Sequence, residues 1–352
     1  MIRKVLKLVY GSLPCLVLSM FVTQTMAQSD DAGKLLQNGL ADGKYLLTGY
    51  LAPVVKPLSL GLNQGWYNTA KPHKTFGVDL TVTVSPMFFP SSDSYYTVDN
   101  SKLTEVELLT KAGGTAQTQP TKVPTMLGPT DPAPVYQKKG NTDPANQFEG
   151  PGGLNIKKTV GNYIPVPMAT LGIGLPKSIE LRFRFCPTLT QDNFKFNLFG
   201  IGVMHDIKQY LPGIKLLPFD LSAFVGYTHM QVDANFGKSN SKVIEQDERG
   251  VFQVNSTTIQ GVISKKVSVL TVYGSVGYNI AKTKIAMKGT YDFNDNNKAD
   301  AGEVNPLTLA FAASGPRISG GFRLKLAVFT LHADYTLQKY SSVSAGFGIN
   351  VR

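Results

Sequence analysis

The sequence predicts an all-β protein: a 14-stranded antiparallel transmembrane β-barrel with a short N-terminal helical segment. The first observation is the end of the chain, Arg317 to Arg352, where apolar and polar residues alternate through three consecutive stretches. Alternation places one row of side chains on each face of a strand, and about ten residues cross a bilayer when the strand is tilted. A soluble antiparallel sandwich also alternates, but the strand length and the start of the chain favour a membrane protein.

The second observation is the start of the chain. Arg3, Lys4 and Lys7 precede an apolar run from Leu8 to Val22, and small residues follow near Ala27. This pattern is typical of a secretory signal peptide, here residues 1–27, rather than of a membrane-spanning helix. Export of a β-barrel predicts the cell outer membrane of a Gram-negative bacterium, after cleavage of the signal peptide near Ala27.

Composition excludes several classes of protein. The formal charge is +11, and removal of the signal peptide takes away three cations and no acids, which leaves +8. The cations are scattered and form no basic run with interleaved aromatics, so we expect no nucleic-acid partner. Cys186 is the one cysteine of the mature chain, which excludes a disulfide within it. We expect a monomer in contact with outer-membrane lipid.

Residues 28–58 form the predicted helical segment. Five leucines fall near helical spacing, and Pro53 and Pro57 are expected to end the helix. Such a segment can lie on the periplasmic rim or plug the lumen as a hatch, and the pattern leaves both open. The hatch candidates are Leu35, Leu36, Leu40, Leu46 and Leu47.

Residues 59–352 form the predicted barrel, and residues 111–157, rich in Pro and Gly, form its long extracellular loop. Aromatics near the predicted strand ends, Trp66 among them, are expected in the girdles at the membrane interfaces. The count of 14 includes strands from near Leu60, at Val269–Ile280, Lys284–Tyr291 and Leu307–Ala313, and at the start of the C-terminal stretch. It depends most on Tyr95–Leu108, without which the number of strands would be odd.

The sequence carries no motif for catalysis: G-x-S-x-G, H-E-x-x-H, C-x-x-C and the P-loop are all missing, so we expect no enzyme. One loop has oxygen-bearing residues at calcium-loop spacing, although Asp/Asn-rich turns are also common for backbone reasons alone. We therefore expect no cofactor other than a possible Ca²⁺. Its candidate ligands are Asp292, Asn294, Asn296, Asp300 and Glu303.

The polar rows of the strands face the predicted lumen, and several of them are charged. The lumen and ligand candidates are Glu180, Arg182, Arg184, Arg323 and Lys325. These charges either solvate and cross-link the barrel interior or make the lumen favour anions, and both readings stay open.

Several runs in the second half of the chain carry a resemblance to a known family. They are Ile164–Pro167, Gly172–Pro176, Ile179–Arg184, Phe199–Val203, His205–Gly213, Leu217–Ser222 and Tyr340–Arg352. The chain resembles an uncharacterised Bacteroidota outer-membrane β-barrel family that is similar to the FadL-like long-chain fatty-acid transporter porins. The resemblance implies a 14-stranded barrel, an N-terminal hatch in the lumen and a hydrophobic ligand. The Asn-Pro-Ala motif of the transporters' hatch region is missing here.

These observations predict a porin-like outer-membrane channel or transporter for a small hydrophobic or amphipathic solute, gated by the N-terminal helix. The alternative is a structural or partner-binding barrel of an envelope or secretion assembly, with the segment 111–157 as its extracellular contact. The two differ in the lumen, because a transporter needs a path through it and a scaffold does not.

Overall fold

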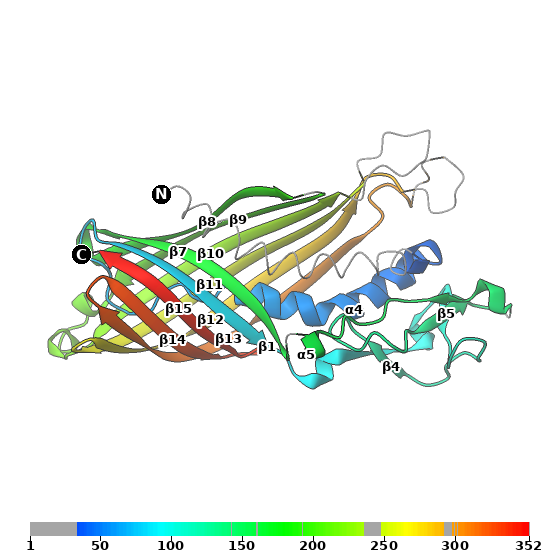
Figure 1. Ribbon diagram of the computed structural model, residues 1–352, viewed down its shortest axis with the longest axis horizontal. Coiled ribbons are helices and arrows are strands. Elements are labelled where there is room, and N and C mark those ends of the chain that lie inside the picture. The colour runs from blue at the N-terminus through cyan, green and yellow to red at the C-terminus, as the bar shows by residue number, and fades with distance from the viewer. Residues whose placement is uncertain are drawn as a thin grey trace.

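The structure is a computed structural model that describes residues 34–141, 143–159, 161–191, 193–235, 248–291, 298, 300 and 302–351. The predicted signal peptide lies outside these residues. The described chain consists of an antiparallel barrel, a helix that enters it, and a small domain at one of its ends (Figure 1).

The barrel has ten strands, so the predicted count of 14 is wrong. Every neighbouring pair is antiparallel, and β1 closes the barrel by pairing with both β7 and β15. The strands are β1 (Val78–Phe88), β7 (Tyr163–Leu175), β8 (Ile179–Gln191), β9 (Phe194–Asp206), β10 (Asp220–Asn235), β11 (Arg249–Val267), β12 (Leu270–Lys288), β13 (Thr308–Leu326), β14 (Phe329–Leu337) and β15 (Ser342–Val351).

Two long strands account for half of the error. β12 covers most of the two strands predicted between residues 269 and 291, and β13 joins the two predicted between 307 and 326. Gly315 and Pro316 lie between the two predicted strands, but β13 runs through them. β14 pairs only with Ile318–Leu326, so Pro316 has a strand neighbour on one side, where it pairs with Tyr278. Proline has no backbone N–H, but at such an edge position this does not interrupt the hydrogen bonds between paired strands.

The other two surplus strands lie outside the barrel wall. The chain around Leu60 belongs to a helix. The segment Tyr95–Leu108 lies in a compact domain between β1 and β7, residues 89–162, which we call the loop domain. Its elements are η2 (Ser91–Ser94), β2 (Tyr95–Val98), η3 (Asn100–Lys102), β3 (Val106–Leu108), β4 (Thr121–Pro124), β5 (Val135–Lys138), η4 (Pro144–Asn146), β6 (Phe148–Glu149) and α5 (Ile156–Thr159). β2 pairs with β4, and β5 lies between β3 and β6.

The helix α4 (Leu40–Gly61) runs from the loop domain into the barrel (Figure 1). It continues through Pro53 and Pro57, where we expected it to end. Each proline removes one backbone hydrogen bond, but the part of the helix that follows Pro53 buries Val54, Val55 and Leu60. Burial of such side chains contributes about 1.5–3 kcal/mol each, which is enough to offset the prolines.

The two ends of the barrel differ. Short connections join the strands at one end: η5 (Pro176–Ser178), residues 268–269 and residues 327–328; η6 (Lys208–Tyr210) and η7 (Ile214–Leu216) also lie there, between β9 and β10. We call this the short-turn end. The loop domain and the connections β10–β11 and β12–β13 lie at the other, the long-loop end, together with the short connections β8–β9 and β14–β15. Helix α4 enters at the long-loop end, and β1 begins at the short-turn end (Figure 1).

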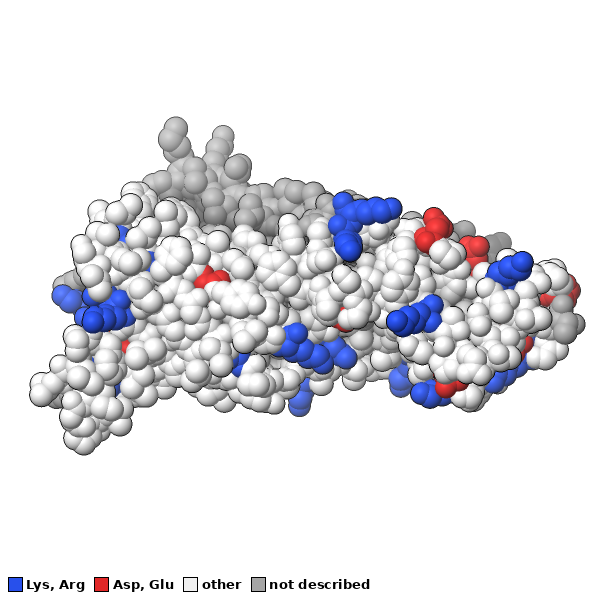
Figure 2. All heavy atoms as spheres, turned by 90° about the horizontal axis from the view of Figure 1, so that it is seen from below, with Lys and Arg blue, Asp and Glu red and all other residues white. Residues whose placement is uncertain are grey.

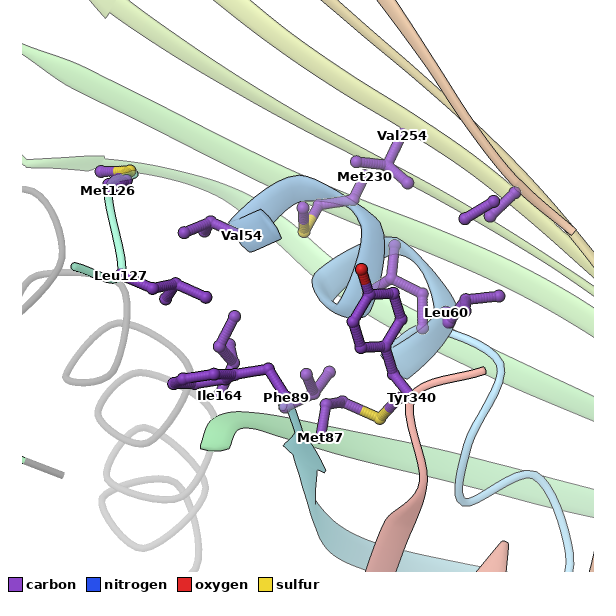
Figure 3. Packing of buried hydrophobic residues seen from close by; sticks show 14 of the residues in the cluster. Val54, Leu60, Met87, Phe89, Met126, Leu127, Ile164, Met230, Val254 and Tyr340 are labelled. Carbon is purple, nitrogen blue, oxygen red and sulfur yellow. The ribbon is translucent and has the colours of Figure 1, made fainter. Parts of the chain in front are cut away.

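The core has two main parts. The part of the lumen nearest the long-loop end, which we call the upper lumen, holds an apolar cluster. This cluster packs α4 against the barrel wall and part of the loop domain (Figure 3). Its members include Val54, Leu60, Met87, Met230 and Val254. A second cluster joins the N-terminal half of α4 to the loop domain and to the upper part of β13. Helix α4 thus connects the lumen, the barrel rim and the loop domain.

The outer wall is apolar, as expected for a barrel in lipid. Large hydrophobic side chains point outward from strand after strand, among them Val225, Ile259, Val276, Ile318, Leu331 and Phe347. On the face shown in Figure 2 the barrel part is mostly uncharged, with Lys and Arg in a few separate groups. Among the described residues, no helix has the length and apolar character needed to cross a membrane.

Candidate functional site

The lumen is occupied by the protein's own chain. After Gly61 the chain leaves α4 and passes down the barrel to β1; we call residues 62–73 of this stretch the lumen segment. Most of its residues are buried. The segment has no sustained periodicity, because its contacts on several sides come from different strands and no single face repeats.

Three wall arginines hold the lumen segment through its backbone carbonyls; we call them the arginine clamp. Arg184 on β8 donates to the carbonyls of Leu62, at 2.7 Å, and Gln64. Arg182, on the same strand, donates to the Trp66 carbonyl at 2.6 Å, and Arg317 on β13 donates to the Asn63 carbonyl at 3.1 Å.

All three clamp guanidiniums are buried. An arginine cannot shed its proton, so a buried one needs acceptors or a carboxylate, and the carbonyls supply them. Arg184 has two of its hydrogen bonds on these carbonyls and a third, of 3.1 Å, on Thr170.

Trp66 fills the lumen beside the clamp. Its side chain is 2% exposed, and the Arg184 guanidinium lies 3.7 Å from the centre of its ring. Phe224 packs against it with ring centroids 5.5 Å apart. Gly202 and Gly226, paired on β9 and β10, leave room for the indole: a Cβ on Gly226 would lie 2.8 Å from the Trp66 ring. We expected Trp66 in an interfacial girdle, and that expectation was wrong.

Other strands hold the lower part of the lumen segment. The Ala70 amide donates to Ser264 at 3.0 Å, and Ser222 donates to the Ala70 carbonyl at 2.5 Å. Tyr67 bonds to Gln260. The cavity beside Trp66 and Tyr67 measures about 10 Å³, room for about one water molecule.

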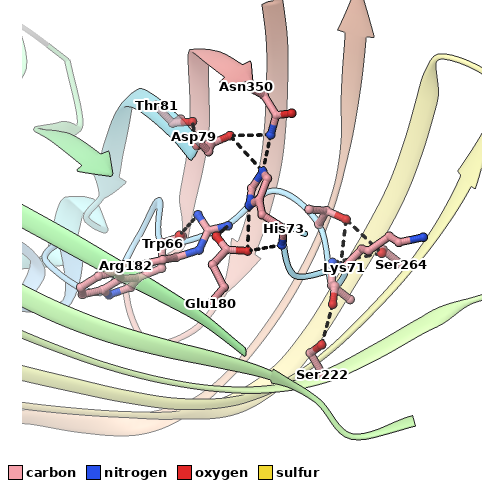
Figure 4. Close-up of polar contacts among 12 residues, drawn as sticks. Trp66, Lys71, His73, Asp79, Thr81, Glu180, Arg182, Ser222, Ser264 and Asn350 are labelled. Carbon is pink, nitrogen blue, oxygen red and sulfur yellow. Dashed lines mark hydrogen bonds and ion pairs between the residues drawn. The ribbon is translucent and has the colours of Figure 1, made fainter. Parts of the chain in front are cut away.

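Near the short-turn end the segment ends in a charged network (Figure 4). Glu180 lies 2.6 Å from Arg182 and 2.9 Å from His73 Nδ1, and it also accepts the His73 amide at 3.0 Å. Asn350 on β15 contacts His73 and donates to Asp79 at 3.3 Å. The network joins β8, β15 and β1 to the segment that precedes β1.

The lumen candidates from the sequence occupy one side of this arrangement. Glu180, Arg182 and Arg184 are buried in β8 and take part in the contacts above. Arg323 is buried and Lys325 half-buried on β13, close to the short-turn end. The guanidiniums of Arg182 and Arg184 are thus occupied by protein groups.

The hatch candidates lie above the lumen rather than in it. Leu35, Leu36, Leu46 and Leu47 are buried in the cluster between α4, the loop domain and β13, and Leu40 packs on its edge. The residues that fill the lumen are Val54, Leu60, Leu62, Trp66 and Tyr67. The sequence did not indicate them as lumen residues, because all five follow Pro53, the first of the two prolines at which the helix was expected to end.

The predicted calcium loop is described only in part. Asp292, Asn294 and Asn296 lie outside the described residues. Asp300 and Glu303 contact each other, the Asp300 amide donating to the Glu303 carboxylate at 3.0 Å. Among the described residues no group of three or more His, Cys, Asp or Glu side chains could hold a metal ion.

Comparison with known families gives one match over nearly the whole chain. Residues 5–351 match the model described as "Family of unknown function (DUF6588)", and the chain therefore belongs to this family. No curated protein matches the sequence. The match assigns no ligand, so the function must be argued from the lumen itself.

Solved structures with some likeness are outer-membrane barrels. Ail, the attachment invasion locus protein of Yersinia pestis, is 9% identical over 79% of this chain and 98% of its own, with a TM-score of 0.24. The translocator domain of the autotransporter NalP from Neisseria meningitidis is 11% identical over 85% and 93%, with a TM-score of 0.26. The outer membrane channel DcaP of Acinetobacter baumannii is 8% identical over 81% and 99%, with a TM-score of 0.15.

None of these three proteins is described as an enzyme. TM-scores this low carry no argument about mechanism. The outer-membrane barrel class rests on the closed sheet and its apolar wall.

Proposed function

We propose that this member of the DUF6588 family is an outer-membrane barrel that is closed by its own chain and presents the loop domain outside the cell as a partner-binding scaffold. The observation that carries the proposal is the arginine clamp on Leu62, Asn63, Gln64 and Trp66. A conducting lumen is lined by groups that water can reach, whereas these guanidiniums are buried and donate to carbonyls of the lumen segment.

The orientation follows from the connections. Outer-membrane barrels have short turns on the periplasmic side and long loops outside. This rule puts η5 and the turns at 268–269 and 327–328 in the periplasm, and the loop domain with the start of α4 outside. The two longest connections, the loop domain between β1 and β7 and residues 289–307 between β12 and β13, both lie at this outer end.

The loop domain is fixed to helix α4, which fills the upper lumen. Asp42 near the start of α4 accepts hydrogen bonds from the backbone amides of Thr104, Glu105 and Val106 at 2.7–2.9 Å. Further along α4, the Tyr50 hydroxyl donates to the Gly152 carbonyl at 2.9 Å. A partner that binds the loop domain therefore binds a rigid platform that is anchored in the lumen.

Labelling of intact cells tests the orientation and the display. In a Cys186→Ser background, Lys111→Cys in the loop domain should react with a membrane-impermeant maleimide on whole cells. Lys265→Cys at the short-turn end is the matched control and should react only after the outer membrane is opened. Both positions are exposed. The opposite pattern would place the loop domain in the periplasm and overturn the proposal.

Transport of a small hydrophobic or amphipathic solute, as the resemblance to the fatty-acid transporters implies, is the second candidate. One observation favours it: three methionines, Met87, Met168 and Met230, line the apolar upper lumen around α4. Methionine is flexible and adapts to different apolar guests. An amphipathic chain could replace α4 there if the helix withdrew.

Uptake separates the two candidates. Cells that lack any other fatty-acid transporter should take up radiolabelled oleate no faster with this protein than with an empty vector, if the barrel is a sealed scaffold. Heat-modifiable mobility in gels shows that the barrel is folded in these cells. Uptake above the empty-vector background would then favour transport and contradict the sealed scaffold.

A further inference from the structure

A second cavity opens at the short-turn end, below the lumen segment. It measures about 380 Å³, within the size range of small-molecule sites. Its lining is strongly basic: five cations, Lys71, Lys74, Lys266, Arg323 and Lys325, against one carboxylate, Asp220. The cations come from the lumen segment, the residue that follows it, β11 and β13, so the cavity exists only when the lumen segment is in place.

Arg323 at the inner side of this cavity lacks a partner. Its side chain is 6% exposed. Over the residues that the structure describes, its guanidinium makes no hydrogen bond or ion pair, and its Nε is buried without an acceptor. A buried arginine stays charged, so leaving it without an acceptor costs free energy unless water or a bound anion meets it. Each clamp arginine, by contrast, donates to at least one backbone carbonyl of the lumen segment.

The acids nearest to Arg323 are already engaged. Asp79 and Glu180 both act on it electrostatically. Glu180, however, lies between Arg182 and His73. Asp79 accepts hydrogen bonds from Thr81 at 2.6 Å and from Asn350. Neither carboxylate forms a direct pair with Arg323.

The lysines add mobile positive charge around this fixed group. Lys71, Lys74 and Lys266 are exposed, and Lys325 donates to Asn350 while Arg323 and Lys266 repel its ammonium. Like charges gathered in a concave site lower the energy of an anion that enters it. The planar fork of an arginine binds two oxygens of a phosphate at once, and lysines add point charges that adapt to the rest of the anion.

We propose that this cavity binds a small multivalent anion that carries phosphate groups, with Arg323 as its inner ligand and Lys71, Lys266 and Lys325 around it. The site faces the periplasm in the orientation argued above. It does not depend on whether the barrel displays a domain or conducts a solute, because the cavity lies outside the sealed part of the lumen.

Calorimetry on the purified full chain in detergent tests the site with inorganic pyrophosphate at low ionic strength. The wild type should bind one equivalent saturably, and added salt should weaken binding because the contacts are ionic. Arg323→Gln should weaken it about tenfold or more, as loss of a charge-assisted hydrogen bond implies. Heat-modifiable mobility in gels shows that the variant is folded.

Two further variants keep the test decisive. Lys71→Gln with Lys266→Gln removes two exposed charges that line the cavity, and this pair should also weaken binding. Lys102→Gln, in the loop domain at the opposite end, is the control and should bind as the wild type does. Absence of saturable binding, equal affinity in all variants, or tighter binding of citrate than of pyrophosphate would overturn the phosphate site.

Discussion

Trp66 is the residue that most clearly decides the state of the lumen. It is nearly fully buried between the Arg184 guanidinium, Phe224 and two wall glycines. An aromatic ring of this size in a narrow barrel leaves little space around it, and the neighbouring cavity is about 10 Å³. Gly202 and Gly226 make room for the indole, because a side chain at either position would contact the Trp66 ring.

A substitution at Gly226 tests this fit. Gly226→Ala would place a Cβ 2.8 Å from the indole, so we expect it to destabilise the plugged barrel by about 1–3 kcal/mol through overpacking. Gly261→Ala on β11 is the matched control, since its Cβ would meet nothing within 4 Å. Urea unfolding followed by tryptophan fluorescence measures both. Equal midpoints for the two variants would show that Trp66 is not seated there.

At this scale the sequence predicted one thing well and missed another. Period-two alternation correctly put Arg182 and Arg184 inside the barrel. It could not show that their acceptors are the carbonyls of Leu62, Gln64 and Trp66, because backbone groups leave no mark in a sequence. Trp66 itself carries the same local signal in a girdle and in a lumen.

Among the elements, β13 explains one of the four surplus predicted strands and the position of α4. β14 stops at Leu337, opposite Ile318, so the upper part of β13 has no strand on that side. Helix α4 packs there instead, and Leu309 and Phe311 of β13 lie in its apolar cluster. Whether a neighbouring strand continues is a tertiary fact, so Gly315-Pro316 could not be recognised as the interior of a strand from the sequence alone.

Asp42 ties α4 to the loop domain. Burial raises the pKa of its carboxyl, but the amides of Val106, Thr104 and Glu105 outweigh that effect and lower the pKa below its ordinary value of 3.8. A carboxyl whose pKa is lowered by folding stabilises the docked state fully above its unfolded pKa. That contribution is lost as the pH falls through the lower, folded pKa.

Acid should therefore loosen the loop domain. As the pH falls below about 3.8, we expect amide exchange at Thr104–Val106 to speed up in the wild type. Asp42→Asn should show the faster exchange already at neutral pH and little further change in acid. Asp143→Asn, an N-cap in the loop domain away from α4, is the control and should keep the wild-type response at 104–106. A wild-type exchange rate independent of pH, after correction for intrinsic exchange, would contradict the role of Asp42.

For the molecule as a whole, the lipid-facing wall sets where charge is tolerated. Phe322 and Leu326 point outward on the same strand, 48% and 56% exposed. Leu326 is the last residue of β13, whereas Phe322 lies four residues inside it. An arginine near the bilayer midplane costs about 2–4 kcal/mol and one near an interface about 0–1 kcal/mol.

We therefore expect Phe322→Arg to destabilise the barrel by roughly 2–4 kcal/mol and Leu326→Arg by roughly 0–1 kcal/mol. Reversible unfolding in lipid vesicles measures the difference, with the second variant as the control for adding an arginine to this strand. Two equal and small effects would mean that this side of the barrel does not face lipid.

The whole molecule is a ten-stranded barrel whose lumen is closed in two layers, by apolar packing of α4 above and by the arginine clamp on the lumen segment below. The hatch candidates from the sequence lie above both layers. Removal of those leucines alone therefore leaves the clamp on Leu62–Trp66 untouched.

Single-channel conductance in planar bilayers tests this closure most directly. The full chain and a variant lacking residues 34–51 should show no steady open level, because the clamp stays in place. A variant lacking 34–70, which removes α4 and most of the lumen segment, should show a steady open channel while its gel mobility still shifts on heating. Steady conductance from the full chain, or none from the folded 34–70 deletion, would contradict a barrel sealed by its own chain.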